Sequence, residues 1–289
     1  MLTILSMPRA FTGIYKTIQE NAIQSWLCIT PKPEIILFGD DEGTAEVAKK
    51  YSIHHIPDVK QLEIGTPVIS DLFVKAADKS SKEYMCFVNS DVILDPNLFN
   101  VAKKAQEKAR NSLLISRRWD LDWNEEINFK DKSWFRKIKT AANNNGNLFS
   151  HEAIDLFIFP KDLYRCMPPL TIGFPGSKYD NWMIYHAKSQ GLTVFDLTES
   201  ITIVHQNHPA RPYSELSPEK AAEHMRSLKL IGGYGYCYDV HDADYKITEK
   251  MEIVKNHLPA NYILRQLKRI LQRIIDPIRF RLPWINRPR

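Results

Sequence analysis

The stretch Glu83-Tyr-Met-Cys-Phe-Val-Asn-Ser-Asp-Val-Ile-Leu94 decides how the rest of the chain is interpreted. Its apolar part, Tyr84 to Val88, is typical of a strand that is buried on both faces of a sheet. In an open α/β sheet, ligands bind at the carboxyl ends of the strands. We therefore expect Asp91, which follows this strand, to hold a divalent cation there. The alternative is that Asp91 only caps a turn.

Strands and helices alternate over the first 120 residues. Apolar runs are separated by segments with apolar residues at helical spacing, such as Ile18, Ala22 and Trp26. This alternation predicts an α/β fold with a mostly parallel sheet covered by helices on both faces. The expected strands are 2–5, 34–38, 53–56, 84–88 and 113–116, and the expected helices are 14–27, 44–51, 66–80 (with Thr66 as N-cap) and 96–108.

The second half of the chain has a weaker pattern. Residues 120–147 are polar and aromatic, and the run Asn143 to Asn147 predicts a turn or loop. Past Gly232-Gly233 no clear element is expected until a C-terminal helix. Between these two regions we expect strands at 154–159, 193–196 and 201–204, and a helix at 180–190.

Composition sets broad limits on the class of protein. The chain has 289 residues, of which 44% are hydrophobic and 25% are charged, as in ordinary globular proteins. The N-terminal residues lack the pattern of a signal peptide, and no uninterrupted apolar segment is long enough to span a bilayer. The four cysteines form no CxxC pair, which favours reduced side chains. We therefore expect a cytoplasmic location.

The formal net charge of +5 is unevenly distributed along the chain. The segment from Pro259 to Arg289 holds eight basic residues and one acid, Asp276, so it carries +7 and the remaining residues sum to −2. The basic character belongs to the C-terminal segment and not to the body. A nucleic-acid-binding surface spread over the fold is therefore not expected.

The chain lacks the common phosphate-binding loops. No GxGxxG follows the first strand, and GxxxxGK[ST] is absent. The residues after the first strand, Ser6-Met-Pro-Arg-Ala10, also differ from the glycine-rich loop of nucleotidyl transferases. What remains is a series of acids and histidines near strand ends. A cation beside a diphosphate needs only one or two carboxylates, since phosphate oxygens and water complete its coordination.

Several motifs together resemble one family. The ordered series resembles bacterial and plant glycosyltransferase-like proteins of the GT-A fold, over roughly residues 2 to 245. The segments are Gly65-Thr-Pro-Val-Ile-Ser-Asp-Leu-Phe73, Phe87-Val-Asn-Ser-Asp-Val-Ile-Leu94, Arg117-Arg-Trp-Asp-Leu-Asp122, Ile154-Asp-Leu-Phe-Ile-Phe-Pro160, Tyr179-Asp-Asn-Trp182 and Val204-His-Gln-Asn-His208.

This resemblance implies a nucleoside-diphosphate sugar donor and a manganese or magnesium ion. The DxD motif of that fold is here Asn89-Ser90-Asp91, in which Asn89 can bind a ribose hydroxyl but adds no charge. Asp91 is the implied metal ligand, and His205, with His208 three residues later, is the implied late histidine that completes the site. The other implied donor-binding residues are Ser6, Asp40, Asp71, Arg117 and Arg118.

Each of these assignments has a structural alternative. Asp40 and Asp71 can be helix-start or surface acids, and a lone histidine is more often structural. Arg117 and Arg118 can neutralise the departing diphosphate, or they can pair with nearby acids on the surface.

Two acids compete for the role of catalytic base. Asp180 resembles the acceptor-side carboxylate of inverting members, which removes the proton from the acceptor hydroxyl. Its structural alternative is an N-cap for the helix that follows it. Asp155 is the rival base, and its alternative is a strand-end acid paired with Arg117 or Arg118.

The C-terminal segment predicts an amphipathic helix. Ile263, Leu267, Ile270, Leu271, Ile274 and Ile278 recur at helical spacing, with basic residues between them. One interpretation is a helix that lies in an anionic membrane interface. The other is a final helix that packs on the protein's own core with a solvated basic face.

Taken together, we expect a metal-dependent glycosyltransferase that moves a sugar to a hydroxyl on a glycan or lipid-linked glycan. It would be peripheral on the cytoplasmic face of a membrane. The alternative is a catalytically inactive nucleotide- or sugar-binding module docked at a membrane. The expected division is a donor half at 1–120, an acceptor half at 121–245 and a C-terminal extension at 246–289.

Overall fold

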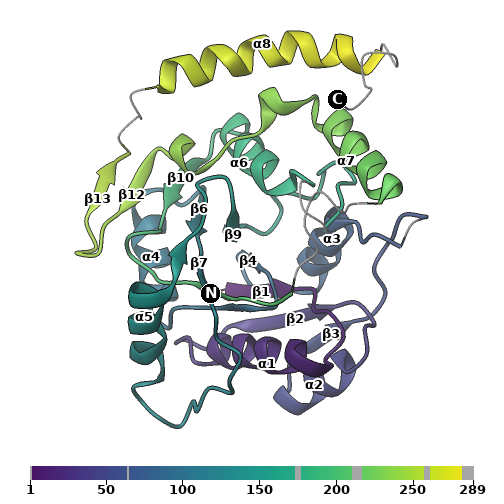
Figure 1. The fold of residues 1–289 in the computed structure, drawn as a ribbon. Coiled ribbons are helices and arrows are strands. Elements are labelled where there is room, and N and C mark those ends of the chain that lie inside the picture. Colours follow the sequence, from purple (N-terminus) through teal and green to yellow (C-terminus); the bar gives the residue numbers. More distant parts are fainter. Residues whose placement is uncertain (1, 64, 173–176, 210–216, 257–260, 282–289) are drawn as a thin grey trace.

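The computed structural model describes residues 2–63, 65–172, 177–209, 217–256 and 261–281 (Figure 1). Within these ranges, nine strands form one sheet in the order β13-β12-β10-β6-β9-β4-β1-β2-β3. The strands are β1 (Leu2–Ser6), β2 (Glu34–Phe38), β3 (His54–Ile56), β4 (Tyr84–Val88), β6 (Ser112–Arg117), β9 (Ile154–Pro160), β10 (Thr193–Asp196), β12 (Tyr245–Ile247) and β13 (Ile253–Lys255).

Strand β9 breaks the parallel pattern of the sheet at its centre. It runs antiparallel to both neighbours, with Val88 opposite Leu156 and Arg117 opposite Ile154. The start of β9 therefore lies at the edge where β4 and β6 end. This topology brings Asp155 to the same edge as the Asn89-Ser90-Asp91 segment.

Helices cover both faces of the sheet and form two apolar cores. One core includes Phe73, Phe157 and Met183, and the other includes Trp26 and Val101. All five side chains are almost completely buried. The helices are α1 (Gly13–Leu27), α2 (Thr44–Tyr51), α3 (Ile69–Lys79), α4 (Leu98–Lys108), α5 (Trp134–Asn145), α6 (Tyr179–Ser189), α7 (Pro218–Ile231) and α8 (Tyr262–Arg281).

A second, smaller sheet lies beside the end of β4. Its order is β5 (Val92–Ile93), β11 (Val204–Gln206), β7 (Trp119–Leu121) and β8 (Asn147–Leu148). Strand β11 pairs antiparallel with β5 and parallel with β7, which places His205 opposite Val92 on one side and Asp120 on the other. This register brings three distant parts of the chain together.

The expected α/β class, with a mostly parallel sheet between helices and a C-terminal helix, is confirmed. One boundary is wrong: Thr66 is not the N-cap of α3. Pro67 and Val68 instead form bridges with Gln61 and Thr171, and the helix begins at Ile69.

Other differences lie in the second half of the chain. The run Asn143 to Asn147 is mostly the last turn of α5, because Trp134, Ile138 and Ala142 bury one face of that helix. Helix α7 was not expected, and the strand expected at 201–204 lies at Val204–Gln206. The large sheet also continues past residue 245 through β12 and β13.

Candidate active site

Three side chains converge at the carboxyl edge of the large sheet. Asp91 Oδ2 lies 3.1 Å from His208 Nε2 and 3.6 Å from His205 Nε2. The possible ligand atoms of Asp91, His205 and His208 all lie within 4.8 Å of one another. The side chains are mostly buried, with exposed fractions of 16%, 14% and 8%. A cation bound by these mostly buried groups would exchange part of its water shell for them.

A polar network extends from this cluster. His205 Nδ1 lies 3.1 Å from Asp120 Oδ1, and Arg118 Nε donates to the same oxygen over 2.8 Å. The other arm of Arg118 donates to Asp155 Oδ2 at 2.6 Å. Asn89 then donates to Asp155 Oδ1, also at 2.6 Å. The network thus begins and ends within the segment that follows β4.

These contacts set the protonation of the cluster. Burial disfavours the charged form of Asp91, but the contacts with His205 and His208 outweigh it and hold the pKa of Asp91 well below its usual value. Burial also disfavours the imidazolium of His205, but Asp120 and Asp91 raise its pKa to about 9. Without a cation, His205 therefore carries a proton that neutralises Asp91, and a bound metal would replace that proton.

The cluster fits a divalent metal ion. Among the described residues, Asp91 Oδ1 is buried and has no hydrogen-bond partner, so an atom from outside the protein is expected there. Ligand atoms that share a cation at bond lengths of about 2.1 Å lie roughly 3 to 4 Å apart, and the two distances from Asp91 Oδ2 to the histidine nitrogens are 3.1 and 3.6 Å. One carboxylate with two imidazoles favours manganese over magnesium, which prefers oxygen ligands. The Asp120 carboxylate lies 3.1 Å from His205 Nδ1, where carboxylates often stand beside the histidines of metal sites, although within the described residues this nitrogen makes no well-aligned hydrogen bond.

Asp120 was not among the residues assigned to the site from sequence, and His208 was noted there only as the second histidine after His205. The His-x-x-His spacing was the available signal for His208, because both rings can face one point. Asp120 gave no such signal, since only the pairing of β7 with β11 places it beside His205.

Two of the expected donor-binding hydroxyls make hydrogen bonds inside the fold. Ser6 is fully buried, and its hydroxyl donates to the Val88 carbonyl over 2.7 Å. The Ser90 hydroxyl donates to Gln19 Oε1 over 2.8 Å, and the same oxygen accepts the backbone N–H of Arg9. Both serines thus fix the loops around the site, and their contact with a donor stays a prediction.

Asp40 and Asp71 lie outside the polar network. Asp40 is exposed in the turn after β2, where Gly39 adopts a φ of +91° that an L side chain rarely takes. Asp71, in the first turn of α3, accepts the Lys60 backbone N–H at 2.8 Å and pairs with Lys75 at 2.9 Å. Their roles in donor binding stay predictions.

The two arginines have different surroundings. Arg118 belongs to the network, where Asp155 and Asp120 raise its pKa despite burial. Arg117 turns the other way and donates from Nε to the Phe149 carbonyl at 2.9 Å. Only Arg118 is therefore placed to sense charge at the metal cluster.

Asp180 lies in the first turn of α6 and is partly buried. Its Oδ1 accepts the backbone N–H of Asn181 at 2.9 Å. Burial raises the pKa of Asp180 to about 6, and the charge of Asp155 adds to this effect. The charges of Asp180, Asp155 and Asp91 all act on the buried Tyr179 hydroxyl, whose pKa burial raises well above its usual value. Asp180 therefore belongs to the same electrostatic region as the metal cluster.

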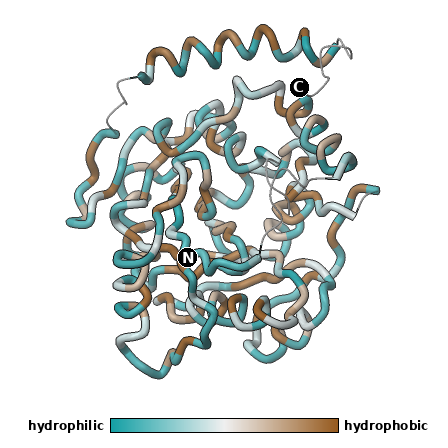
Figure 2. Tube along the Cα trace, in the orientation of Figure 1, coloured by the Kyte–Doolittle hydropathy of each residue, from teal (hydrophilic) through white to brown (hydrophobic). Residues whose placement is uncertain are grey.

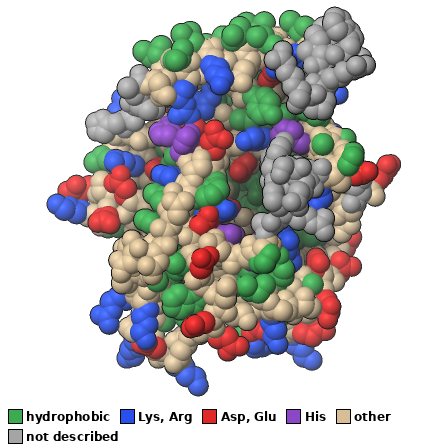
Figure 3. Space-filling view, viewed as in Figure 1, with side chains coloured by type: hydrophobic (Ala, Val, Ile, Leu, Met, Phe, Trp, Pro, Cys, Tyr) green, Lys and Arg blue, Asp and Glu red, His purple; other side chains and the backbone are tan. Residues whose placement is uncertain are grey.

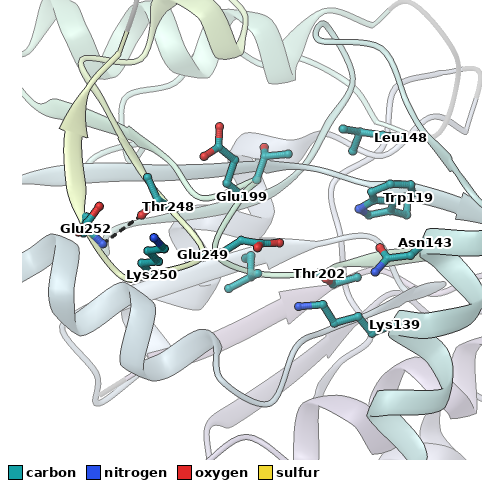
Figure 4. Close-up of a pocket in the computed structure, with 12 residues that line it drawn as sticks. Trp119, Lys139, Asn143, Leu148, Glu199, Thr202, Thr248, Glu249, Lys250 and Glu252 are labelled. Carbon is teal, nitrogen blue, oxygen red and sulfur yellow. Dashed lines mark hydrogen bonds between the residues drawn. The ribbon is translucent and has the colours of Figure 1, made fainter.

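A cavity adjoins the start of α6. It has a volume of about 310 Å³ and lies between α6 and α8, with Lys178, Asn181, Tyr238 and Lys268 among its lining residues. A larger cavity of about 550 Å³ is lined by residues such as Trp119, Lys139 and Glu249 (Figure 4). None of the residues assigned to the site from sequence lines either cavity, but two lining residues of the smaller one, Lys178 and Asn181, flank Asp180 in the chain.

No protein-family model matches this sequence, and no curated protein matches it. Solved structures do match. The structure of residues 1–349 of S. aureus TarS in complex with UDP-GlcNAc has a TM-score of 0.52 and 17% identity, over 80% of this chain and 66% of that chain. Glucosyl-3-phosphoglycerate synthase from Mycobacterium tuberculosis, in complex with Mn²⁺, UDP and phosphoglyceric acid, has a TM-score of 0.50 and 12% identity, over 81% and 79%.

A further structure of S. aureus TarS matches 92% of this chain with a TM-score of 0.52 and 14% identity. This chain spans only 43% of that one, and less than two thirds of the 1–349 structure as well. At these identities the likeness establishes the fold. The chain has the GT-A fold that the sequence motifs implied.

Proposed function

We propose that the protein is a metal-dependent glycosyltransferase that moves a sugar from a nucleoside diphosphate to a hydroxyl acceptor. The observation that carries this proposal is the convergence of Asp91, His205 and His208 at the carboxyl edge of a GT-A sheet. The matching TarS structure is a complex with UDP-GlcNAc, and the matching synthase structure is a complex with Mn²⁺, UDP and phosphoglyceric acid. A uridine nucleotide and manganese are therefore the first donor and metal to test.

In this proposal Asp91, His205 and His208 hold the cation. When bound, the cation supplies positive charge that stabilises the departing diphosphate. Asp120 positions His205, and Arg118 adds a second fixed positive charge near the leaving group. Asn89 keeps Asp155 in place through its amide and is available to a ribose through its carbonyl oxygen.

Asp180 is the better candidate for the base. Both oxygens of Asp155 accept strong hydrogen bonds, from Asn89 and Arg118, so its carboxylate is held in the network and is less basic than one without such partners. The pKa of Asp180 near 6 leaves it ionised at neutral pH but more basic than an ordinary carboxylate. A single base on the acceptor side agrees with an inverting reaction.

We place the acceptor in the smaller cavity, because its lining residues Lys178 and Asn181 lie on either side of Asp180 in the chain. The proposed reaction requires only that the acceptor, such as a glycan or a lipid-linked glycan, carries a hydroxyl group. A lipid-linked acceptor lies at a membrane, so attachment to the cytoplasmic face of an anionic membrane belongs to the same proposal. None of the described helices is long and apolar enough to cross a bilayer.

The test is release of nucleoside diphosphate from a panel of sugar nucleotides, with manganese, magnesium or a chelator present. We expect release from at least one donor with manganese, and its loss with the chelator. No release from any donor, together with equal UDP binding by wild type and Asp91→Ala, would contradict the proposal.

One observation favours a second candidate, a catalytically silent module that binds a nucleotide or sugar. Asn89 replaces the first acid of the metal motif, and its amide is used to bind Asp155. Tight UDP binding with neither hydrolysis nor transfer, across glycan and lipid-linked acceptors, would favour this candidate over the enzyme.

A further inference from the structure

Helix α8 is amphipathic, but its faces are arranged opposite to the expectation of a solvated basic face. At about 100° per residue, its large aliphatic residues share one side of the helix and Arg265, Arg269, Arg273 and Asp276 share the other. The charged side faces the protein, and Arg269 and Asp276 are buried there. In Figure 1, α8 lies across one end of the molecule, next to α6 and α7.

The inner face is fixed by specific polar contacts. Arg269 donates from both terminal nitrogens to the two oxygens of Asp242, at 2.6 and 2.8 Å, and lies over the Tyr238 ring. Asp276 accepts the backbone N–H of Tyr234 at 2.8 Å, and Arg273 donates to the Gly235 carbonyl at 3.0 Å. Rotating the helix would leave these buried charges without partners, which is strongly unfavourable.

Two glycines allow this close approach. A Cβ at Gly235 would lie 2.6 Å from the backbone oxygen of Arg269 in α8. A Cβ at Gly233 would lie 2.3 Å from Asp276 Oδ2, and Gly233 also has a φ of +107°. The segment that receives α8 is therefore shaped for its charged face.

The outer face is a continuous apolar stripe. Figure 2 shows hydrophobic and hydrophilic residues alternating along α8, and Figure 3 shows hydrophobic side chains on its outer edge. Folded monomers rarely leave a large contiguous apolar patch in water, so the stripe is expected to have an occupant. The exposed fractions are 74% for Ile263, 68% for Leu264, 58% for Leu267, 52% for Ile270, 55% for Leu271, 60% for Ile274, 38% for Ile275 and 54% for Ile278.

The charges around the stripe indicate which occupant fits. Lys268 and Arg279 are exposed along one edge of the stripe, and Arg281 is exposed at its end. Asp276 is the only acid within Tyr262–Arg281, all of which is described, and it faces inward. A second copy would bring like charges together across the contact. An anionic lipid surface instead offers both an apolar layer and negative charge.

We propose that α8 lies in the interface of an anionic lipid bilayer with its aliphatic stripe inserted and Lys268 and Arg279 at the headgroups. The inner arginines bind the helix to the enzyme and do not contact lipid. This inference rests on the proposed membrane attachment and not on the transfer reaction. Vesicle binding and nucleoside-diphosphate release in solution report the two separately.

The experiment is co-sedimentation of the full chain with vesicles of phosphatidylcholine containing phosphatidylglycerol, and with vesicles of phosphatidylcholine alone. The stripe variant is Leu267→Gln with Ile270→Gln and Ile274→Gln, and we expect its vesicle affinity to fall at least 10-fold. The matched control is Leu230→Gln, an exposed aliphatic residue of α7, which should bind like wild type. Lys268→Gln with Arg279→Gln should lose the preference for phosphatidylglycerol.

Far-UV circular dichroism and thermal melting show whether each variant folds, and the exposed positions make folding defects small. If the stripe variant binds vesicles as tightly as wild type, the role of this face is overturned, although membrane attachment still holds. No binding by wild type would overturn both. A dimer in size-exclusion chromatography that the stripe variant dissociates, without vesicle binding, would assign the stripe to a second copy.

Discussion

Asp91 Oδ2 lies 3.1 Å from His208 Nε2, although 117 positions separate the two residues in the chain. The contact exists because the small sheet pairs β11 with β5, directly after Asp91, and the chain then turns His208 back over the carboxylate. Within the part of the chain that the structure describes, the buried Asp91 Oδ1 has no hydrogen-bond partner and completes this arrangement.

His208→Ala is expected to weaken manganese binding by more than about 10-fold, because it removes one of three ligands. Isothermal titration with Mn²⁺ alone measures this without any assay of activity. His54→Ala is the matched control, since that histidine is 48% exposed and pairs with Glu34 far from the cluster in the sheet order. Equal affinity in His208→Ala and wild type would remove His208 from the site.

Asp120→Asn is expected to weaken manganese binding by about 10- to 100-fold although Asp120 is not one of the three proposed ligands. The reason is that Asp120 orients His205 through Nδ1. The loss should appear in the metal affinity measured by titration, with a normal circular dichroism spectrum. A variant that binds manganese as tightly as wild type would show that His205 needs no such support.

Asp180→Asn and Asp155→Asn should fail in different ways. If Asp180 is the base, its variant should lose about 10² to 10⁴ in kcat while UDP affinity stays within a few-fold. Asp155→Asn should instead weaken UDP and manganese binding, because it releases Arg118 and Asn89. Transfer kinetics with UDP titration decide between them, and the reversed pattern would make Asp155 the base.

The pH profile should report Asp180. Its pKa of about 6 predicts that kcat falls tenfold per pH unit below about pH 6, where the protonated acid cannot accept a proton.

Because the folded pKa of Asp180 lies above the usual value of 3.8, stability is lost as pH rises from about 4 through 6. The free energy of unfolding of Asp180→Asn at pH 7.5 should therefore be about 1 to 3 kcal/mol higher than that of wild type. Urea denaturation measures this difference. Unchanged or lower stability would mean that burial does not set this pKa.

Arg118→Gln should destabilise the fold by about 3 to 5 kcal/mol, because it leaves Asp155 and Asp120 buried without their cation. Urea denaturation measures this difference. Arg110→Gln breaks a pair with Glu83 in which the arginine side chain is 78% exposed, so solvent screening should make its effect on stability much smaller. Similar losses in the two variants would mean that the network does not behave as a buried ion pair.

The local pattern of the sequence was sufficient to place those elements in which burial dictates the residue type. The runs at 34–38 and 84–88 and the helix at 44–51 lie where they were predicted, because apolar strands and amphipathic helices carry their period in the sequence. The short strands β7 and β8 and helix α7 could not be predicted in the same way. Their pairing and packing partners lie far away in the chain, and their own patterns are weak.

The sequence by itself determined that an acid follows a buried strand, that two histidines follow later, and that the C-terminal helix has an apolar side and a charged side. Only the tertiary structure decided that these groups meet and which side of the helix faces outward. Long-range strand pairing brings the acid and the histidines together, because the register of β11 between β5 and β7 fixes where His205 points. Buried ion pairs set the orientation of α8, because Asp242 holds Arg269 inside and thereby turns the aliphatic stripe outward.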